Sequence, residues 1–325
     1  MKSLSKLMCV ALVLGVTASV AFAQAKVDPN VPSYEKVSGV SGNVVGVGSD
    51  TLLNMMTMWN EEFKKVYPNV STSYTGKGSG TAPPALIEGT AQLGPMSRKM
   101  KDTELDAFEE KYGFKPTTLN VAVDCVAVFV NDENPVKGLT MPQLDCIFSQ
   151  TQNSGFRNIT EWGQVGLTGD WKNKPISLYG RNSVSGTYGF FKKHALFKGD
   201  FKDSVKEQPG SAAVVNAVAN DLGAIGYSGI GYKTADVKAL PIAKSHEDKL
   251  AEPTFENALN GKYPLGRTLM INVVKKPNEP LPQLVQEFIK FVLSKQGQQV
   301  VVDDGFGPLS PEQIKKELAK VGISE

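Results

Sequence analysis

The sequence predicts an α/β fold with a largely parallel sheet, divided into two domains. Short apolar strands alternate with amphipathic helices along most of the chain. This order is typical of parallel sheets, whose neighbouring strands are joined by helical crossovers. About 300 residues follow the N-terminal apolar segment, and this is more than a single hydrophobic core usually holds.

Residues 1–23 have the pattern of a cleaved signal peptide. Lys2 and Lys6 give a positive start, residues 7–20 are apolar, and residues 21–23 read Ala-Phe-Ala, a small-x-small cleavage sequence. The apolar run is short for a membrane anchor and polar sequence follows it. We therefore expect an exported, soluble protein.

The charge of the mature chain is balanced. The whole sequence has 35 Lys and Arg against 33 Asp and Glu, and the signal segment holds two of the lysines and no acid, so 33 of each remain. This balance argues against a general electrostatic attraction to nucleic acid. Any selectivity for anions must come from a local site.

The first part of the chain alternates strands and helices after a leader. Residues 24–41, rich in Pro, Ser and Gly, predict a flexible leader. A strand is expected over 43–47, and a helix over 52–66, where apolar residues recur at helical spacing. A second strand over 70–74 leads to a helix over 83–89, which begins with two prolines and stops at a glycine.

The same alternation continues to the C-terminus, with no internal repeat. The most apolar strand of the chain is expected over 121–130. The further strands are expected over 175–180, 223–227 and 265–274, and the further helices over 139–148, 188–196, 212–219, 281–293 and 311–321.

Two cysteines remain after cleavage, Cys125 and Cys146. Export permits a disulfide between them, and two buried thiols are the alternative. His194 and His246 are the only histidines and lie far apart in the sequence, so we expect no metal site. We also expect no cofactor.

Three loops share one design, a glycine-, serine- and threonine-rich turn between a strand and a helix. A helix start carries free N–H groups and a partial positive charge, so it attracts anions. Each loop alone can be a simple helix cap, but helix starts at the carboxyl ends of neighbouring strands converge and form ligand sites. The loops are Gly48-Ser49-Asp50-Thr51, Gly78-Ser79-Gly80-Thr81 and Ser185-Gly186-Thr187.

Arg181 is the charged candidate for such a site, because it ends a strand four residues before Ser185. A guanidinium fork matches two oxygens of a tetrahedral oxyanion. The alternative is a structural arginine that forms an ion pair.

These segments resemble the phosphate-binding proteins of the bacterial high-affinity phosphate ABC transporter. The resemblance depends mainly on Arg-x-x-x-Ser-Gly-Thr at 181–187 and on Gly-Ala-Ile-Gly-Tyr at 223–227. The loops at 46–51 and 78–79 are similar to the family's first two ligand loops, and the order and spacing of all four segments agree over nearly the whole mature chain.

The resemblance implies a periplasmic receptor with two lobes that close over one phosphate, the type II periplasmic-binding-protein fold. Each lobe would be a mainly parallel sheet flanked by helices, and two strands would form the hinge near 121–126 and 266–270. The first lobe would comprise residues 42–122 and 268–325, and the second residues 123–267. The implied partners are inorganic phosphate and the membrane permease subunits of an ABC transporter, and we expect a monomer.

The resemblance also implies the binding residues. Arg181, Ser185, Gly186 and Thr187 would bind phosphate from the second lobe. The first lobe would bind it through backbone and hydroxyl groups of the first two loops, namely Ser49, Asp50, Thr51, Leu52 and Ser79.

The sequence departs from the family pattern at Ser97. Well-known members place an aspartate there, which accepts a proton from phosphate and repels sulfate, whereas a serine can donate as well as accept. We expect Ser97 to contact the anion and Asp50 to supply the acceptor, unless Asp50 caps its own helix. Ser183 stands where some relatives have the acidic partner of the arginine, and Arg98 is a second candidate cation.

Two other functions remain open. A receptor of the same architecture could take sulfate or arsenate, and some related proteins resemble phosphatases. Neither histidine lies in a candidate loop, and no acidic cluster suggests a metal pair, so the sequence favours binding without catalysis.

Overall fold

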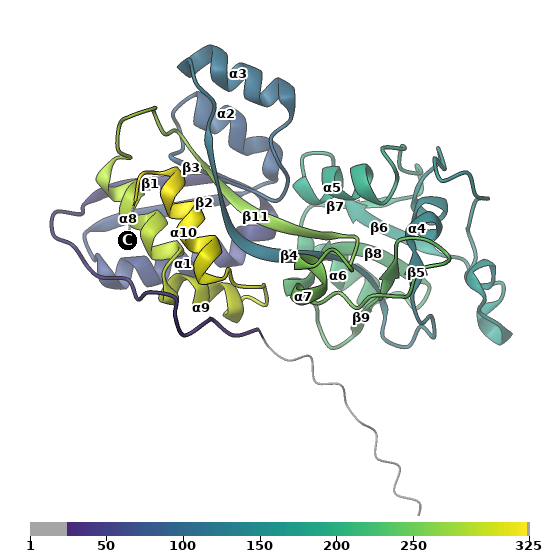
Figure 1. The fold of residues 1–325 in the computed structure, drawn as a ribbon. Coiled ribbons are helices and arrows are strands. Elements are labelled where there is room, and N and C mark those ends of the chain that lie inside the picture. Colours follow the sequence, from purple (N-terminus) through teal and green to yellow (C-terminus); the bar gives the residue numbers. More distant parts are fainter. Residues whose placement is uncertain (1–24, 324–325) are drawn as a thin grey trace, which may run out of the picture.

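Two strands, β4 (Thr117–Asn131) and β11 (Gly266–Val273), join the two lobes of the protein (Figure 1). The structure is a computed structural model that describes residues 25–323, so the expected signal peptide lies outside the described residues. Residues 117–125 of β4 pair with β11, and residues 126–130 pair with β8 (Ala224–Gly229). The strand β4 therefore belongs to the sheets of both lobes.

The remaining strands extend this pair on both sides. They are β1 (Gly42–Gly48), β2 (Val70–Gly76), β3 (Leu93–Met96), β6 (Ser177–Arg181), β7 (Lys206–Gln208) and β9 (Val237–Ala239), beside a separate pair formed by β5 (Leu139–Thr140) and β10 (Ile242–Ala243). Within the described residues, nine strands follow the order β2-β1-β3-β11-β4-β8-β6-β7, with β9 paired to β4. The sets β2-β1-β3 and β8-β6-β7 are each parallel. The strand β11 runs antiparallel to its neighbours β3 and β4, and β4 runs antiparallel to β8.

Helices cover both faces of each sheet. In the first lobe they are α1 (Leu53–Val66), α8 (Gln283–Val292), α9 (Lys295–Asp303) and α10 (Pro311–Lys320) on one face, with α2 (Ala82–Ile87) and α3 (Asp102–Tyr112) on the other. In the second lobe they are α4 (Met141–Phe148), α5 (Gly186–His194), α6 (Ser211–Ala219) and the short α7 (Phe255–Leu259). None of the helices within residues 25–323 combines the length and apolar character needed to cross a membrane.

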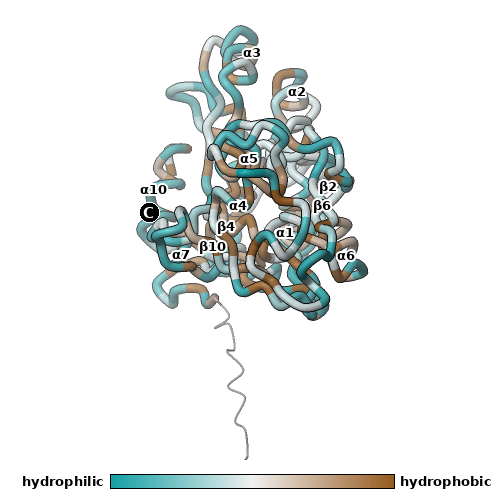
Figure 2. Tube along the Cα trace, turned by 90° about the vertical axis from the view of Figure 1, so that its right-hand side faces the viewer, coloured by the Kyte–Doolittle hydropathy of each residue, from teal (hydrophilic) through white to brown (hydrophobic). Residues whose placement is uncertain are grey.

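Each lobe has its own hydrophobic core, and the cores meet along β4. Figure 2 shows hydrophobic segments gathered in the interior around β4, while the outer loops are mostly hydrophilic. Residues 121–123 of β4 pack into the main core of the first lobe, and Cys125 and Val126 pack into that of the second. The passage from one core to the other therefore falls at Asp124, the one charged residue among the otherwise apolar residues 121–130.

Residues 31–34 of the leader pack against the first lobe, whereas we expected a flexible segment. Val31 is buried in the first-lobe core, and the Tyr34 hydroxyl donates to Glu287 Oε2 over 2.7 Å. The amide of Lys295 donates to the carbonyl of Pro32 over 2.8 Å. A Pro- and Ser-rich composition predicts flexibility only where nothing covers the segment, and here an apolar residue and a buried carboxylate hold residues 31–34 against α8 and α9.

The two cysteines do not form a disulfide, so the alternative of two buried thiols applies. Cys125 lies on β4, where its thiol approaches the carbonyl of Thr254 at 3.5 Å, and Cys146 lies on α4 near Ser154. Burial raises the pKa of both thiols, that of Cys125 well above its ordinary value. Neither thiol is therefore a reactive thiolate.

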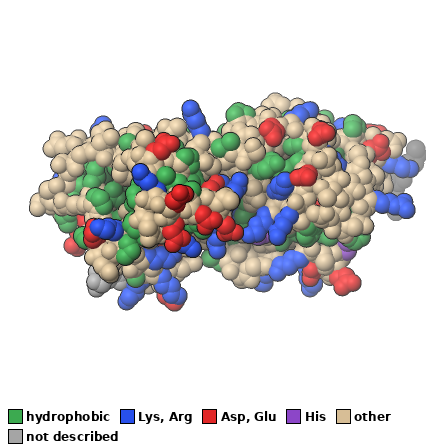
Figure 3. Space-filling view, turned by 90° about the horizontal axis from the view of Figure 1, so that it is seen from above, with side chains coloured by type: hydrophobic (Ala, Val, Ile, Leu, Met, Phe, Trp, Pro, Cys, Tyr) green, Lys and Arg blue, Asp and Glu red, His purple; other side chains and the backbone are tan. Residues whose placement is uncertain are grey.

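Charges of both signs lie side by side on one face of the two lobes. Figure 3 shows this for the face seen from above, where Lys and Arg side chains lie among Asp and Glu. A face of this kind differs from the continuous basic surface that attracts nucleic acid.

Candidate functional site

The three predicted loops meet between the lobes. Thr51 of the first loop and Thr187 of the third approach each other, with 3.0 Å between their hydroxyl oxygens. The amide of Gly80, in the second loop, donates to the carbonyl of Val184 over 3.0 Å. Loops far apart in the sequence and carried by different lobes thus form one site.

Local capping explains the shape of two of these loops. The Ser49 hydroxyl accepts from the amide of Thr51, and the Ser185 hydroxyl accepts from the amides of Thr187 and Tyr188. Ser49 and Ser185 are therefore N-caps, as the simpler interpretation holds. In the second loop Gly78 has φ +125°, and a Cβ there would lie 2.8 Å from the carbonyl oxygen of Val184, so only glycine fits.

Five buried hydroxyl groups line the space between the loops, and we call them the hydroxyl cluster. Ser97 lies at its centre: Ser49 donates to the Ser97 hydroxyl over 2.9 Å, and the hydroxyl of Ser79 lies 3.1 Å from it. The members, none more than 1% exposed, are Ser49, Thr51, Ser79, Ser97 and Thr187. Because hydroxyls donate and accept, such a cluster can rearrange around an oxyanion.

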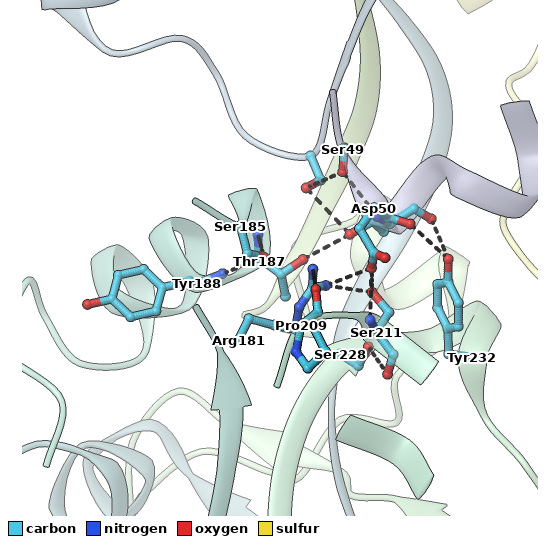
Figure 4. A network of polar contacts seen from close by, with 12 residues as sticks. Ser49, Asp50, Arg181, Ser185, Thr187, Tyr188, Pro209, Ser211, Ser228 and Tyr232 are labelled. Carbon is cyan, nitrogen blue, oxygen red and sulfur yellow. Dashed lines mark hydrogen bonds and ion pairs between the residues drawn. The ribbon is translucent and has the colours of Figure 1, made fainter. Parts of the chain in front are cut away.

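Arg181 lies beside this cluster and is 1% exposed (Figure 4). Its Nη1 donates to the Ser211 hydroxyl over 2.7 Å and lies 3.1 Å from Asp50 Oδ2. Among residues 25–323 its Nε has no hydrogen-bond partner, and Nη2 has only a 3.5 Å contact with the carbonyl of Pro209. Burial lowers the pKa of the guanidinium, and the nearby carboxylate of Asp50 opposes the shift. An unpartnered donor on a buried cation is costly, so the Nε–Nη2 edge is suited to two oxygens of an anion.

Asp50 balances Arg181 and does not cap its own helix, which Ser49 does. Its Oδ2 accepts from the amide of Ser211 over 2.8 Å and from the Ser211 hydroxyl over 2.9 Å. Asp50 thus caps the start of α6 in the other lobe. Ser183 is exposed, so the carboxylate that pairs with the arginine comes from the first loop.

The remaining predicted residues differ in what they offer to a ligand. The Leu52 side chain is fully buried in the first-lobe core, so only its backbone could bind an anion. Gly186 begins α5 and lies directly against Ser79 and Ser97. Arg98 forms two 2.7 Å contacts with the carboxylate of Glu104, so it is an ion-paired residue and not a second cation of the cluster.

Sequence reasoning missed a second buried guanidinium, that of Arg267. It donates to the Thr187 hydroxyl over 3.1 Å and forms an ion pair with Asp124, 2.7 Å between Nη2 and Oδ2. A signal was present in the sequence: Asp124 and Arg267 are each the single charged residue of their strand, and the two charges have opposite signs. Tyr232 was also missed; its hydroxyl donates to the carbonyls of Asp50 and Thr51 and so fixes the first loop.

Known proteins match this chain over most of its length. A family model described as the PBP superfamily domain matches residues 34–296. The phosphate-binding protein PstS of Pseudomonas aeruginosa is 56% identical over 321 residues, 98% of this chain and 99% of that protein. The chain belongs to the PstS family of the PBP superfamily. The resemblance inferred from the sequence is therefore confirmed.

More distant members of the PstS family match over most of their length. The phosphate-binding protein PstS of Staphylococcus epidermidis is 30% identical, covering 86% of this chain and 82% of that protein. A crystal structure from Clostridium perfringens, described as a phosphate ABC transporter substrate-binding protein with bound phosphate, has a TM-score of 0.70 and 27% identity, covering 83% of this chain and all of that one. The expected two-lobed type II fold is confirmed as well.

Proposed function

We propose that this protein binds inorganic phosphate between its two lobes in the periplasm and delivers it to the membrane permease of an ABC transporter. One observation carries the proposal: the hydroxyl cluster, drawn from both lobes, adjoins a buried arginine whose Nε lacks a partner. The membership of this protein in the PstS family supports phosphate as the oxyanion.

The site has enough donors for tight binding. Hydrogen bonds to a charged ligand contribute about 1.5–3 kcal/mol each before losses, and micromolar affinity corresponds to about −8 kcal/mol. The five groups of the hydroxyl cluster and the Nε–Nη2 edge of Arg181 together exceed this requirement. The hydrogen-bond free energy beyond this requirement would offset the cost of desolvating phosphate and of closing the lobes around it.

We further propose that the protein acts by binding alone, as a monomer. Ser49, Ser79 and Ser185 could be imagined as nucleophiles, but each hydroxyl already accepts from a backbone amide. Ser49 and Ser185 accept at the start of their own helices, and Ser79 accepts from the amide of Ser97. His194 ends α5 and His246 lies beside Phe156 on a surface loop, so neither imidazole reaches the hydroxyl cluster as a general base. Within residues 25–323 no three His, Cys, Asp or Glu side chains are placed to hold a metal.

Titration calorimetry on protein stripped of carried-over ligand tests the proposal. Phosphate should bind with one site per chain and a dissociation constant of about 1 μM or below. Arsenate, which has the same tetrahedral form, should compete for that site, and sulfate should bind more weakly. The absence of heat with phosphate, or tighter binding of sulfate, would contradict the proposal.

Asp50→Asn should lower the ratio of phosphate to sulfate affinity by about tenfold or more, a change of about 1.4 kcal/mol. The reason is that the carboxylate of Asp50 lies beside Arg181 and repels a fully deprotonated dianion more than a protonated phosphate. Calorimetry with both anions measures the ratio. A ratio equal to that of the wild type would remove Asp50 from the selectivity of the site.

A further inference from the structure

Asp124 and Arg267 form an ion pair on the two strands that join the lobes. They are directly opposite residues in the antiparallel pairing of β4 with β11. Arg267 Nε lies 2.8 Å and Nη2 2.7 Å from the same carboxylate oxygen, and the two side chains are 4% and 0% exposed. The pair therefore lies at the passage between the two hydrophobic cores, on the strands that both lobes share.

The other hydrogens of this guanidinium reach one group from each lobe. Nη1 donates to the carbonyl oxygen of Ser97 over 2.9 Å, in the loop that follows β3 of the first lobe. Nη2 donates to the hydroxyl of Thr187 over 3.1 Å, in the first turn of α5 in the second lobe. The ring of Phe190, also on α5, faces the guanidinium at 5.5 Å. Arg267 thus contacts both sides of the proposed site from the strands between them.

We propose that Arg267 is a positioning residue of the anion site, which acts through the hydroxyl of Thr187. This inference rests on the proposed function. A hydroxyl has one hydrogen and two lone pairs, and a guanidinium can only donate. The N–H of Arg267 therefore occupies a lone pair of Thr187 and leaves the hydroxyl hydrogen to point into the hydroxyl cluster, where it serves as a donor to an oxygen of the anion.

The charge of Arg267 is already compensated and is not needed for the ligand. Asp124 accepts the Nε–H of Arg267, forms an ion pair with its Nη2, and also accepts from the amide of Ile230 over 3.2 Å. Arg181 differs, because its Nε has no partner. The two arginines therefore have separate roles: Arg181 presents a free edge to the anion, and Arg267 fixes the direction of a neighbouring donor.

The same contacts link the positioning effect to closure of the lobes. Ser97 and Thr187 stand on different lobes, so Arg267 can hold both only when the lobes are together. Loss of Arg267 should accordingly weaken binding mainly through faster release of the ligand, since groups that stabilise the bound state act on the dissociation rate.

A double-mutant cycle on the full mature chain tests the inference. Arg267→Met alone would leave a buried carboxylate without its partner, which often prevents folding. The first arm is therefore the apolar pair Arg267→Met with Asp124→Leu, the second is Thr187→Val, and the third combines all three changes. Calorimetry with inorganic phosphate should show that the variants of the first and second arms each lose about 10- to 50-fold in affinity. The variant that combines all three changes should bind phosphate no more weakly than the weaker-binding of the first two variants, because both of these remove the same oriented donor.

Arg267→Lys separates positioning from stability. An ammonium can keep the charge pairing with Asp124, but it lacks the planar fork that reaches Ser97 and Thr187 together. This variant should melt near the wild-type temperature and still lose about tenfold in phosphate affinity. Arg98→Met is the matched control, because it removes another arginine ion pair from the loop that holds Ser97 without touching the hydroxyl cluster.

The outcomes are distinct. Losses that multiply in the combined variant, unchanged affinity in Arg267→Lys, or an equal loss in Arg98→Met would each overturn the positioning role while leaving the proposed function intact. A wild-type protein that binds no phosphate in the same titration would overturn both.

Discussion

Arg181→Met is expected to reduce phosphate affinity about 100-fold or more, because truncating one side of a buried charged hydrogen bond costs about 2–5 kcal/mol. The guanidinium is 1% exposed, and its Nε–Nη2 edge is the part that lacks good partners in the protein. Methionine keeps much of the length and apolar packing of the side chain but no donor. Calorimetry with phosphate measures the loss.

The fold should survive this change. Asp50 would lose its charged partner but keep the amide and hydroxyl of Ser211, and at 13% side-chain exposure it still reaches solvent. Arg181→Lys should recover only a part of the affinity, since one ammonium cannot match two oxygens as the fork does. Arg157→Met, on an exposed loop, is the control for the loss of one positive charge. Phosphate binding that is equal in Arg181→Met and Arg157→Met would mean that another group neutralises the anion.

The parts of the site that could be predicted from the sequence are those that depend on local chemistry. A serine before a helix caps it wherever the helix lies, so the loops around Ser49 and Ser185 could be recognised without knowing the fold. Arg181 was found because it ends a strand next to one of these loops. The strongly periodic helix over 52–66 and the apolar strand over 121–130 were predicted for the same local reason, and they appear as α1 and β4.

The parts that were missed depend on partners distant in the sequence. Asp124 and Arg267 are 143 residues apart, and only the register of β4 against β11 brings them together. Asp50 was expected to accept from the anion or to cap its own helix, and its partners on α6 and at Arg181, which belong to the other lobe, were not foreseen. The helix α3 buries only Phe108 among its eleven residues, and a helix with so narrow an apolar face has little periodicity to detect.

Gly186→Ala is expected to weaken phosphate binding about 100-fold by holding the lobes apart, since overpacking by one methyl group costs about 1–3 kcal/mol. A Cβ at this position would lie 2.2 Å from the Ser79 hydroxyl oxygen and 2.5 Å from that of Ser97. These atoms and the next nearest all belong to the first lobe, whereas Gly186 belongs to the second. The strain therefore falls on the contact between the lobes.

The stability of each lobe should not suffer, because alanine is a better helix residue than glycine by about 1 kcal/mol and Gly186 is the first residue of α5. Calorimetry measures the affinity, and small-angle scattering with phosphate should give a larger radius of gyration than for the wild type. Gly189→Ala is the matched control on the same helix: its Cβ would meet only the flexible side chain of Arg98, at 3.3 Å. Wild-type affinity in Gly186→Ala would show that the lobes do not need to approach this closely around the anion, and the site would then be more open than the contacts between Thr51 and Thr187 imply.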